Sequence, residues 1–321
     1  MLKIIKYSES KKLLWDDFVV NCKKGTLFHL RSFLSYHPEG RFKDHSLIVT
    51  KKEKLFSVFP AAEEIVNNKK YLISHPGASI GSFVSPDILS ISDSIELVKL
   101  LLSYAKENMI NVIRIKLPPN LYQVELSNYM EFAFFRNNFT YTTREMTSIV
   151  FLEKTLSKTV HKFKPSHRRA TRKAMENGVQ VRRTKNFKSF YKILKKNLKI
   201  RHGVAPTHTI NELLSLQRLF PERCVLFGAY LEGKMIAGVV NFVINDRVIL
   251  AFYISHNEKY SEYRSVNLLF YRIFDWAIKL GFQIYDFGIF TVNGEPNMGL
   301  GRFKENFGAS GVFRDTIEIV L

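Results

Sequence analysis

Short apolar runs, which are typical of strands, alternate along the chain with stretches in which apolar residues recur at helical spacing. In the first half, such a pattern predicts a strand at 2–8, helices at 10–25 and 26–38, a hairpin at 45–63, a strand at 69–84, a helix at 91–109, a strand at 111–118, a helix at 121–139 and a strand at 141–153. Nearly the same order follows in the second half, which indicates a duplicated architecture.

In the second half, the pattern predicts a strand at 179–185, helices at 186–203 and 207–220, a hairpin at 224–245, a strand at 247–260, a helix at 265–281 and strands at 282–290 and 312–321. Asn186 is the expected N-cap of the first of these helices, and Gly203 stands just past its end. Between the halves, Ser166 is the expected N-cap of a helix that stops at Gly178.

The repeated order predicts an α/β fold with mixed, mostly antiparallel sheets flanked by helices, in two tandem domains. We expect an N-terminal domain at 1–153, a basic linker helix at 154–178 and a C-terminal domain at 179–321. A chain of 321 residues with 46% hydrophobic residues can bury two cores. Its two cysteines predict neither a disulfide framework nor a zinc site, and we expect no other metal site.

No apolar run resembles a signal peptide or a membrane span, so we expect a cytoplasmic protein. The net charge is +19, and it is concentrated in one segment. Residues 154–202 hold 17 of the 48 lysines and arginines but only one of the 29 acidic residues. Such a local excess attracts phosphates, nucleic acid or an acidic membrane surface, although a solvated basic surface is the alternative interpretation.

Within the basic segment, Arg168, Arg169 and Arg172 fall on one side of the predicted linker helix. Guanidinium groups bind phosphate in a forked geometry, so these arginines are candidate substrate-binding residues, with a solvated linker helix as the alternative. Arg201 and His202 close the next helix and are further candidates for the same cleft.

Three stretches together resemble the FemABX family of aminoacyl transferases and its tandem GNAT-fold acyltransferase relatives. They are "SHPGASIGSFV" at 74–84, "SHRRATRKAMENGVQV" at 166–181, and "DWAIKLGFQIYDFGIF" at 275–290 followed by "GRFKENFGA" at 301–309. The resemblance implies two GNAT-like domains, with the active site in the C-terminal one and acceptor binding by a degenerate N-terminal one.

The resemblance also implies transfer of an acyl or aminoacyl group from acyl-CoA or aminoacyl-tRNA to an amine, without a tightly bound cofactor. The acceptor would be a cell-envelope precursor, such as a peptidoglycan-type peptide or an amino-sugar. In the family, the lysine of the matching "FK" pair meets the reacting centre, which gives this role to Lys304. Phe303 would exclude water beside it, and Arg302 is a neighbouring candidate for substrate binding. A solvent-exposed Lys304 on an amphipathic turn is the alternative.

Asp286 and Tyr253 are the other candidate catalytic residues. Asp286 follows a buried strand, where it would orient the amine or accept its proton. The alternative is a carboxylate bonded to nearby backbone amides. Tyr253 would bond substrate or the oxyanion, or else be a core tyrosine with a satisfied hydroxyl. In the first half, His75 is a candidate for substrate binding because its glycine-containing turn could approach a ligand closely, and a plain turn is the alternative. Arg31 and Tyr36 are weaker candidates for acceptor binding.

The segment 256–269 lacks the glycine-rich turn with which acetyl-CoA-using GNAT enzymes cradle pyrophosphate. This departure weakens acetyl-CoA as donor and leaves room for aminoacyl-tRNA. Ser265 and Asn267 at the start of the next helix remain candidate phosphate-binding residues. A non-catalytic RNA-binding protein on a degenerate transferase fold is the competing function, and peripheral contact with a membrane stays open. The sequence does not indicate an oligomeric state.

Overall fold

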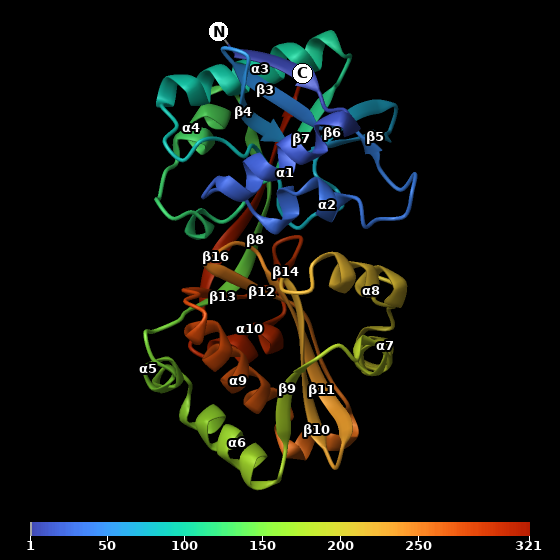
Figure 1. Ribbon diagram of the computed structural model, residues 1–321, viewed down its shortest axis with the longest axis vertical. Coiled ribbons are helices and arrows are strands. Elements are labelled where there is room, and N and C mark those ends of the chain that lie inside the picture. The colour runs from blue at the N-terminus through green and yellow to red at the C-terminus, as the bar shows by residue number, and fades with distance from the viewer. Residues whose placement is uncertain (1) are drawn as a thin grey trace. The chain divides into compact units, whose positions relative to one another are not determined.

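The computed structural model describes residues 2–321, apart from the side chains of residues 201 and 202, and the chain divides into two compact units (Figure 1). The first unit holds Met1–Glu145 and Phe313–Leu321, and the second holds Met146–Val312. The last nine residues therefore pack with the first unit, and the expected linker segment packs within the second. Strands β8 (Thr140–Phe151) and β16 (Ser310–Val320) have residues in both units.

The first unit contains two sheets. One is antiparallel, in the order β1-β3-β4. In the other, β2, β5, β6, β7 and β16 are neighbours in this order, and only β6 and β7 are parallel. The strands are β1 (Leu2–Lys6), β2 (Lys43–Asp44), β3 (Leu47–Lys51), β4 (Lys54–Phe59), β5 (Ala62–Val66), β6 (Lys69–Ser74) and β7 (Val112–Lys116).

The helices of the first unit are α1 (Lys12–Asn21), α2 (Arg31–Leu34), α3 (Ile91–Glu107) and α4 (Tyr129–Arg136). Helix α3 begins where the Ser90 side chain accepts a hydrogen bond from the Asp93 amide. It buries Leu97, Val98 and Leu101 in the core of this unit, together with apolar residues of β3, β7 and α4. The helical spacing of these apolar positions explains why the sequence predicted α3 correctly.

The second unit is built on a sheet in the order β8-β13-β12-β11-β10-β9. Strands β12 and β13 are parallel, and their other neighbours are antiparallel. The strands are β9 (Gln180–Thr184), β10 (Cys224–Leu231), β11 (Lys234–Val243), β12 (Val248–His256) and β13 (Ile284–Ile289), and a small hairpin pairs β14 (Thr291–Val292) with β15 (Glu295–Pro296).

Helices cover both faces of this sheet: α6 and α9 lie on one side, and α7 and α8 lie on the other (Figure 1). The helices are α5 (Leu156–His161), α6 (Pro165–Glu176), α7 (Phe187–His202), α8 (Ile210–Leu219), α9 (Ser265–Lys279) and α10 (Met298–Glu305). Asn186 caps α7 by accepting from the Ser189 amide, and Gly203 ends it with φ of 66°, as predicted.

The core of the second unit is rich in aromatic rings. Phe270 and Phe274 of α9 pack with Phe287 of β13 and with Phe307, and all four are buried. Aromatic pairs of this kind contribute about 0.5–1.5 kcal/mol beyond the area that they bury. This cluster fixes α9 and α10 against the end of β13, where the candidate site lies.

Three local predictions need correction. Residues 26–38 form only a 3-10 turn (Leu27–His29) and the single helical turn α2, because Leu30 between them has an extended backbone (φ −71°, ψ 134°). Helix α4 is confined to the second half of 121–139. Helix α6 begins at Pro165, with Lys164 as N-cap, rather than after Ser166, because proline suits the first helical position.

The mixed α/β class is as predicted, whereas strand β5, the β14–β15 hairpin and helix α10 were not predicted. Within the part of the chain that the structure describes, no helix is both long and apolar enough to cross a membrane.

Candidate functional site

Strands β12 and β13 separate towards their carboxyl ends. Their parallel pairing covers Val248 to Leu250 of β12 and Ile284 to Asp286 of β13. Beyond this point β12 carries a bulge opposite Val240 and Asn241, and the register of β13 against β8 is interrupted after Asp286. Bulges bend strands and end pairing, so the two strands open into a notch in the middle of the sheet.

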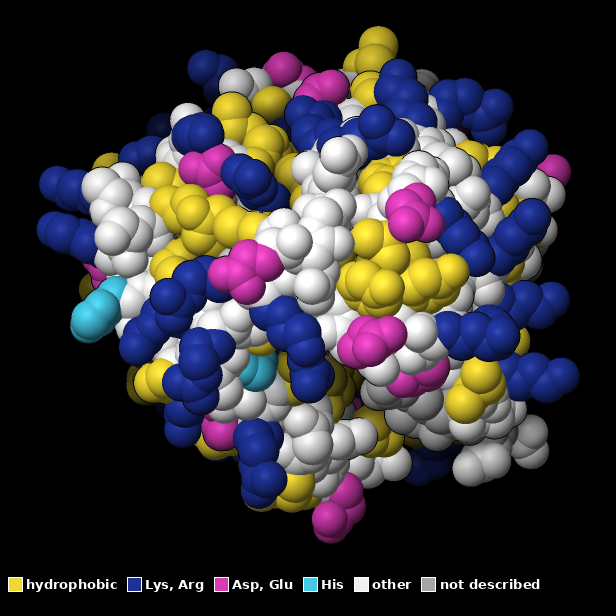
Figure 2. All heavy atoms as spheres, turned by 90° about the horizontal axis from the view of Figure 1, so that it is seen from below, with side chains coloured by type: hydrophobic (Ala, Val, Ile, Leu, Met, Phe, Trp, Pro, Cys, Tyr) yellow, Lys and Arg dark blue, Asp and Glu magenta, His cyan; other side chains and the backbone are white. Residues whose placement is uncertain are grey.

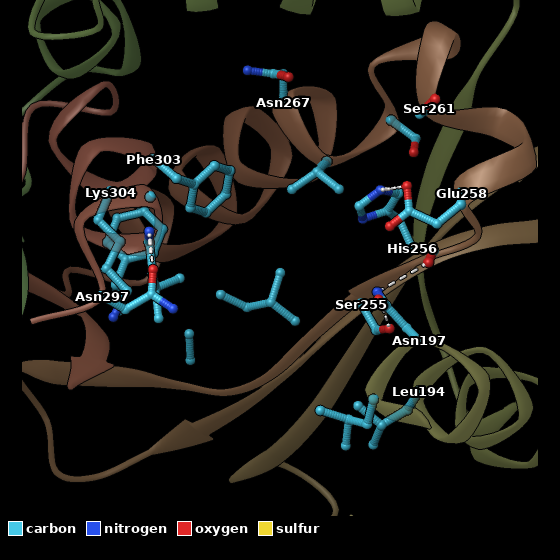
Figure 3. Close-up of a pocket in the computed structure, with 18 of the residues that line it drawn as sticks. Leu194, Asn197, Ser255, His256, Glu258, Ser261, Asn267, Asn297, Phe303 and Lys304 are labelled. Carbon is cyan, nitrogen blue, oxygen red and sulfur yellow. Dashed lines mark hydrogen bonds and ion pairs between the residues drawn. The ribbon is translucent and has the colours of Figure 1, made fainter. Parts of the chain in front are cut away.

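A cavity of about 800 Å³ occupies this notch. Side chains from α6, α7, β12, α9, β13 and α10 line it, so segments distant in sequence meet there. Figure 3 shows Lys304 and Phe303 on one side and His256, Glu258 and Asn197 on the other. Most of the remaining lining is apolar: Leu194, Leu198, Ala251, Phe252, Ile254, Val266, Phe287, Ile289 and Leu300.

Lys304 is buried, with 1% of its surface exposed, although it lines the cavity. Its Nζ donates to the carbonyl oxygens of Gly288 (2.6 Å) and Ile289 (2.8 Å), and the ring of Phe290 lies 5.7 Å away. Because an ammonium in low-dielectric surroundings has a strong field, this charge can stabilise a developing anion in the cavity. The solvent-exposed alternative for Lys304 is thereby removed.

Glycines allow α10 to approach the end of β13. At Gly301, an added Cβ would lie 3.2 Å from the ring of Phe290, closer than most side-chain contacts. The Asn297 side chain caps α10 by accepting from the Leu300 amide, and Gly308 adopts φ of 82° just after the helix. The glycines around Phe303 and Lys304 therefore permit the close packing that buries the lysine.

The N-terminus of α9 forms another part of the wall. Ser265 and Asn267 are buried there, as residues that line the cavity. Asn267 is 8% exposed, and its Nδ2 has no hydrogen-bond partner among the described residues. Arg264, the N-cap, adopts φ of 52° and ψ of 30°. The chain thus takes a left-handed turn before α9 without glycine, and a helix N-terminus favours anions.

Across the cavity, α7 and the end of β12 supply polar groups (Figure 3). Asn197 Nδ2 donates to Ser255 Oγ (3.1 Å) and to the His256 carbonyl (3.2 Å), whereas its buried Oδ1 lacks a partner among the described residues. His256 Nε2 lies 3.5 Å from Glu258 Oε2. This wall therefore offers one unused acceptor and one histidine–carboxylate pair.

Asp286 is fully buried and does not belong to the cavity lining that the structure describes. Its Oδ1 accepts from the Gly288 amide at 2.6 Å and from the Thr147 hydroxyl. The carboxylate thus binds the turn whose carbonyl holds Lys304. This geometry is the backbone-bonded alternative that the sequence left open, and it links Asp286 to the cavity wall through Gly288.

Tyr253 likewise falls outside the described cavity lining. Its hydroxyl is hydrogen-bonded to Thr207 Oγ1 (2.7 Å) and lies 3.0 Å from His208 Nδ1, and burial raises its pKa. The hydroxyl is thus satisfied within the protein, as in the alternative that the sequence left open.

The predicted phosphate-binding arginines lie on α6 outside the described cavity lining. Arg168 is half-buried, and its Nη1 donates to the carbonyls of His161 (2.9 Å) and Phe163 (2.8 Å). Arg169 and Arg172 are exposed, as is Arg302 on α10. Arg201 and His202 were also predicted to bind substrate, but their side chains are not among those that the structure describes.

The three candidates of the first half belong to the first unit. Arg31 is paired with Asp44 at 3.0 Å and donates to Ser46 Oγ at 2.7 Å. Tyr36 is buried, with its ring centroid 5.1 Å from that of Phe33. His75 accepts from the Gly77 amide at 3.0 Å, and burial lowers its pKa to about 3. Each of these side chains has a local structural partner.

Four predicted residues therefore line the cavity together: Lys304, Phe303, Ser265 and Asn267. Sequence reasoning missed His167, Asn197, His256, Glu258 and Arg264, which line it as well. His167 lies beside Arg168 and Arg169 in "SHRRATRK", a stretch that was selected for its positive charge, and this position was the one sequence feature that could have indicated it.

Basic side chains cover much of the second unit's surface. Figure 2 shows lysines and arginines spread over the lower face, among fewer acidic side chains. Arg169, Arg172 and Lys173 of α6 and Lys185 and Lys188 near β9 are all exposed. A surface of this kind suits a polyanionic partner.

Comparison with known proteins agrees with this geometry. Residues 161–305 match the family described as acetyltransferase (GNAT) domain. No curated protein sequence matches the chain. Among solved structures, FemX is similar over 99% of this chain and 97% of its own, with a TM-score of 0.75 and 15% identity.

Two further structures share the fold. The C-terminal domain of a putative lysylphosphatidylglycerol synthetase from Agrobacterium fabrum has a TM-score of 0.61 and 10% identity, over 97% of this chain and 92% of that one. A tandem GNAT protein from the clavulanic acid biosynthesis pathway has a TM-score of 0.58 and 8% identity, over 100% and 98% of the two chains. The predicted tandem GNAT-like fold is thereby confirmed.

Proposed function

We propose that this chain, whose residues 161–305 match the acetyltransferase (GNAT) domain family and whose fold is similar to that of FemX, transfers an acyl or aminoacyl group from acyl-CoA or aminoacyl-tRNA to an amine. The single observation that carries this proposal is the buried ammonium of Lys304 at the wall of the cavity, held by two backbone carbonyls. Attack of an amine on a thioester or ester creates a tetrahedral oxyanion. A fixed positive charge beside that oxygen lowers the barrier to its formation.

In the proposed mechanism, the donor's carbonyl carbon lies beside Lys304. The amine nitrogen attacks this carbon, and the oxyanion forms next to the ammonium. Phe303 and Phe287 keep water away, which strengthens the field of Lys304 and protects the donor from hydrolysis. Loss of one such stabilising group costs about 3–4 kcal/mol in comparable sites.

The donor's phosphates would bind at the N-terminus of α9. Ser265, the buried Asn267 amide without a partner and the left-handed turn at Arg264 support this assignment. The turn lacks glycine, but its backbone has the conformation that glycine usually supplies. This weakens the sequence argument against acyl-CoA, so both donor classes remain in the proposal.

The proposed acceptor is an amine of a cell-envelope precursor, a peptidoglycan-type peptide or an amino-sugar. FemX and a protein named for the synthesis of lysylphosphatidylglycerol share the fold, which supports an aminoacyl or acyl transfer near the membrane. We propose that Arg169 and Arg172, both exposed on α6, attract a polyanionic donor or an acidic membrane surface. Both donor classes occur in the cytoplasm, where we propose that the protein acts.

A donor test examines the proposal. Purified protein is mixed separately with acyl-CoAs and charged tRNAs, each with and without hydroxylamine as a simple amine. Because hydroxylamine attacks thioesters and esters slowly by itself, we expect consumption of one donor class and formation of its hydroxamate to be faster than in a protein-free control. Consumption of neither donor, combined with salt-sensitive binding of uncharged RNA, would replace the proposal by the non-catalytic RNA-binding function.

A further inference from the structure

Transfer of an acyl group to an amine requires a group that removes a proton from the attacking nitrogen. Five titratable side chains line the described cavity: His167, His256, Glu258, Arg264 and Lys304. Arg264 and Lys304 are cations, and the pair of His256 and Glu258 (3.5 Å) lies on the opposite side of the cavity from Lys304 (Figure 3). Asp286 and Tyr253, the sequence-based candidates, fall outside the lining. We propose that His167 is the catalytic base that accepts this proton.

The surroundings of His167 place it near the reacting end of the cavity. The ring lies edge-to-face against Phe307, with 4.7 Å between centroids, and its centroid is 6.3 Å from that of Phe303. These two phenylalanines flank Lys304 in the sequence, and Phe303 lines the cavity with it. His167, on α6, therefore packs against the two phenylalanines that bracket Lys304 in the sequence, and it lines the same cavity as Lys304.

The imidazole nitrogens are available to a ligand. Among the described residues, the hydrogen bonds of His167 are those of its backbone: its amide donates to the Lys164 carbonyl, and its carbonyl accepts from Thr171 Oγ1. The side chain is half-buried. A base for an unknown amine must be able to turn a nitrogen lone pair towards the cavity, and this histidine meets that requirement.

The electrostatic surroundings keep the imidazole neutral near pH 7. Burial lowers the pKa of His167, and the nearby positive charge of Arg264 lowers it further. A neutral imidazole accepts a proton, whereas the protonated ring cannot. Activity should therefore fall as the pH decreases through a pKa below 6.5.

The step balances as follows. The amine nitrogen forms a bond to the donor's carbonyl carbon and gives one proton to His167. The tetrahedral intermediate then expels the sulfur of CoA or the ribose oxygen of tRNA, and the carbon–sulfur or carbon–oxygen bond breaks. The proton on His167 passes to that leaving atom. An amide and a thiol or hydroxyl result, and the imidazole is neutral again.

This inference rests on the proposed function, so its test uses whichever donor class the wild-type protein consumes, with hydroxylamine as acceptor. We expect His167→Gln and His167→Asn to lower kcat/KM by about 100-fold or more at pH 7. Both variants should also lose the acid limb that the wild-type pH profile shows below 6.5. Exogenous imidazole should partly rescue His167→Ala. His161→Gln, which changes an exposed histidine of α5, is the matched control.

The outcomes separate the two proposals. Wild-type protein that consumes no donor overturns the proposed function and this inference with it. Active wild-type protein whose His167 variants keep both the rate and the acid limb overturns this inference alone. If the variants unfold, the wild-type profile decides after division by that of the protein-free reaction, which corrects for protonation of hydroxylamine: a remaining limb below 6.5 supports the inference, and its absence contradicts it.

Discussion

Lys304 and Gly288, sixteen residues apart in sequence, are joined by a hydrogen bond of 2.6 Å between the ammonium and the backbone carbonyl. The Gly288 amide in turn donates to Asp286 Oδ1 at 2.6 Å. One peptide segment therefore connects a buried carboxylate to a buried cation. This arrangement fixes the position of the cation at the cavity wall, which electrostatic stabilisation of an oxyanion requires.

Substitution of Gly288 tests whether the turn sets the position of Lys304. Gly288 has φ of 77°, and a Cβ there would have space, with the Ala251 carbonyl 3.6 Å away. Gly288→Ala should lower the free energy of unfolding by about 1–2 kcal/mol, because a side chain disfavours this conformation. Turnover should fall further than stability explains. Chemical denaturation and donor consumption measure the two effects, and Gly294→Ala, in the β14–β15 turn with φ of 81°, is the control.

Asp286 and Thr147 offer a second test of the same network. Asp286→Ala removes the acceptor for the part-buried Gly288 amide and for the buried Thr147 hydroxyl. Each donor left without a partner costs about 1–3 kcal/mol. Asp286→Asn keeps an acceptor oxygen and should be milder in stability and in kcat. An equal loss of kcat in the two variants at equal folding would instead indicate a direct chemical role for the carboxylate.

The contribution of the α9 N-terminus is measured through donor affinity. Asn267→Ala and Ser265→Ala should each raise the KM for the donor roughly tenfold, or about 1.4 kcal/mol, with a smaller change in kcat. The reason is that both side chains line the cavity where the helix favours anions. Asn177→Ala, at an exposed asparagine after α6, is the control. An unchanged KM would move the donor's phosphates away from this helix.

Salt dependence distinguishes the donors. If the exposed Arg169, Arg172 and Lys173 contact tRNA phosphates, changing all three to glutamine should reduce the slope of log affinity against log salt by roughly 0.7–0.9 per contact. The affinity for acyl-CoA should depend on salt far less than the affinity for tRNA does. Filter binding of charged tRNA between 50 and about 200 mM salt makes this measurement. An unchanged slope would show that these three residues do not contact tRNA phosphates and would favour the interpretation as a solvated basic surface.

The stability of the first unit should depend on pH through His29. This histidine is buried between Thr26 Oγ1 (2.7 Å) and the Gly81 carbonyl (2.9 Å), and burial lowers its pKa to about 4. The unfolded chain binds this proton near 6.5, so the stabilising contribution is present above that pH and is lost as the pH falls towards 4. The loss amounts to roughly 3 kcal/mol.

Urea denaturation at pH 7 and pH 4.5 tests this prediction against His29→Gln. The variant should be less stable at pH 7 but should lose less stability on acidification than the wild type. Parallel losses in both proteins would show that other groups dominate. His161→Gln, at an exposed site, should behave as the wild type does.

The fold could be predicted from the sequence where apolar spacing and caps agreed. Helix α9 is apolar on most sides and is buried, and α7 begins at Asn186 and ends at Gly203 as its residues indicate. The sequence pattern alone does not predict that the Lys304 side chain is buried, because its burial depends on the packing of Gly301 against Phe290. Only the resemblance to the FemABX family pointed to a lysine at the reacting centre.

Which of the remaining residues line the cavity depends on side-chain directions that the sequence pattern does not specify. Neighbouring residues on a helix point about 100° apart, so His167 lines the cavity whereas the adjacent Arg168 turns to the carbonyls after α5. The bulge in β12 decides which strand residues face the notch, and Tyr253 turns away. These outcomes follow from tertiary packing.

Donor consumption by Lys304→Met is the most direct measurement of the central claim. We expect at least a 100- to 1,000-fold loss of kcat in a folded variant, because the oxyanion would form without the buried charge. Lys279→Met, at an exposed lysine of α9, should retain the wild-type rate. A folded Lys304→Met protein that transfers acyl groups at the wild-type rate would contradict the account.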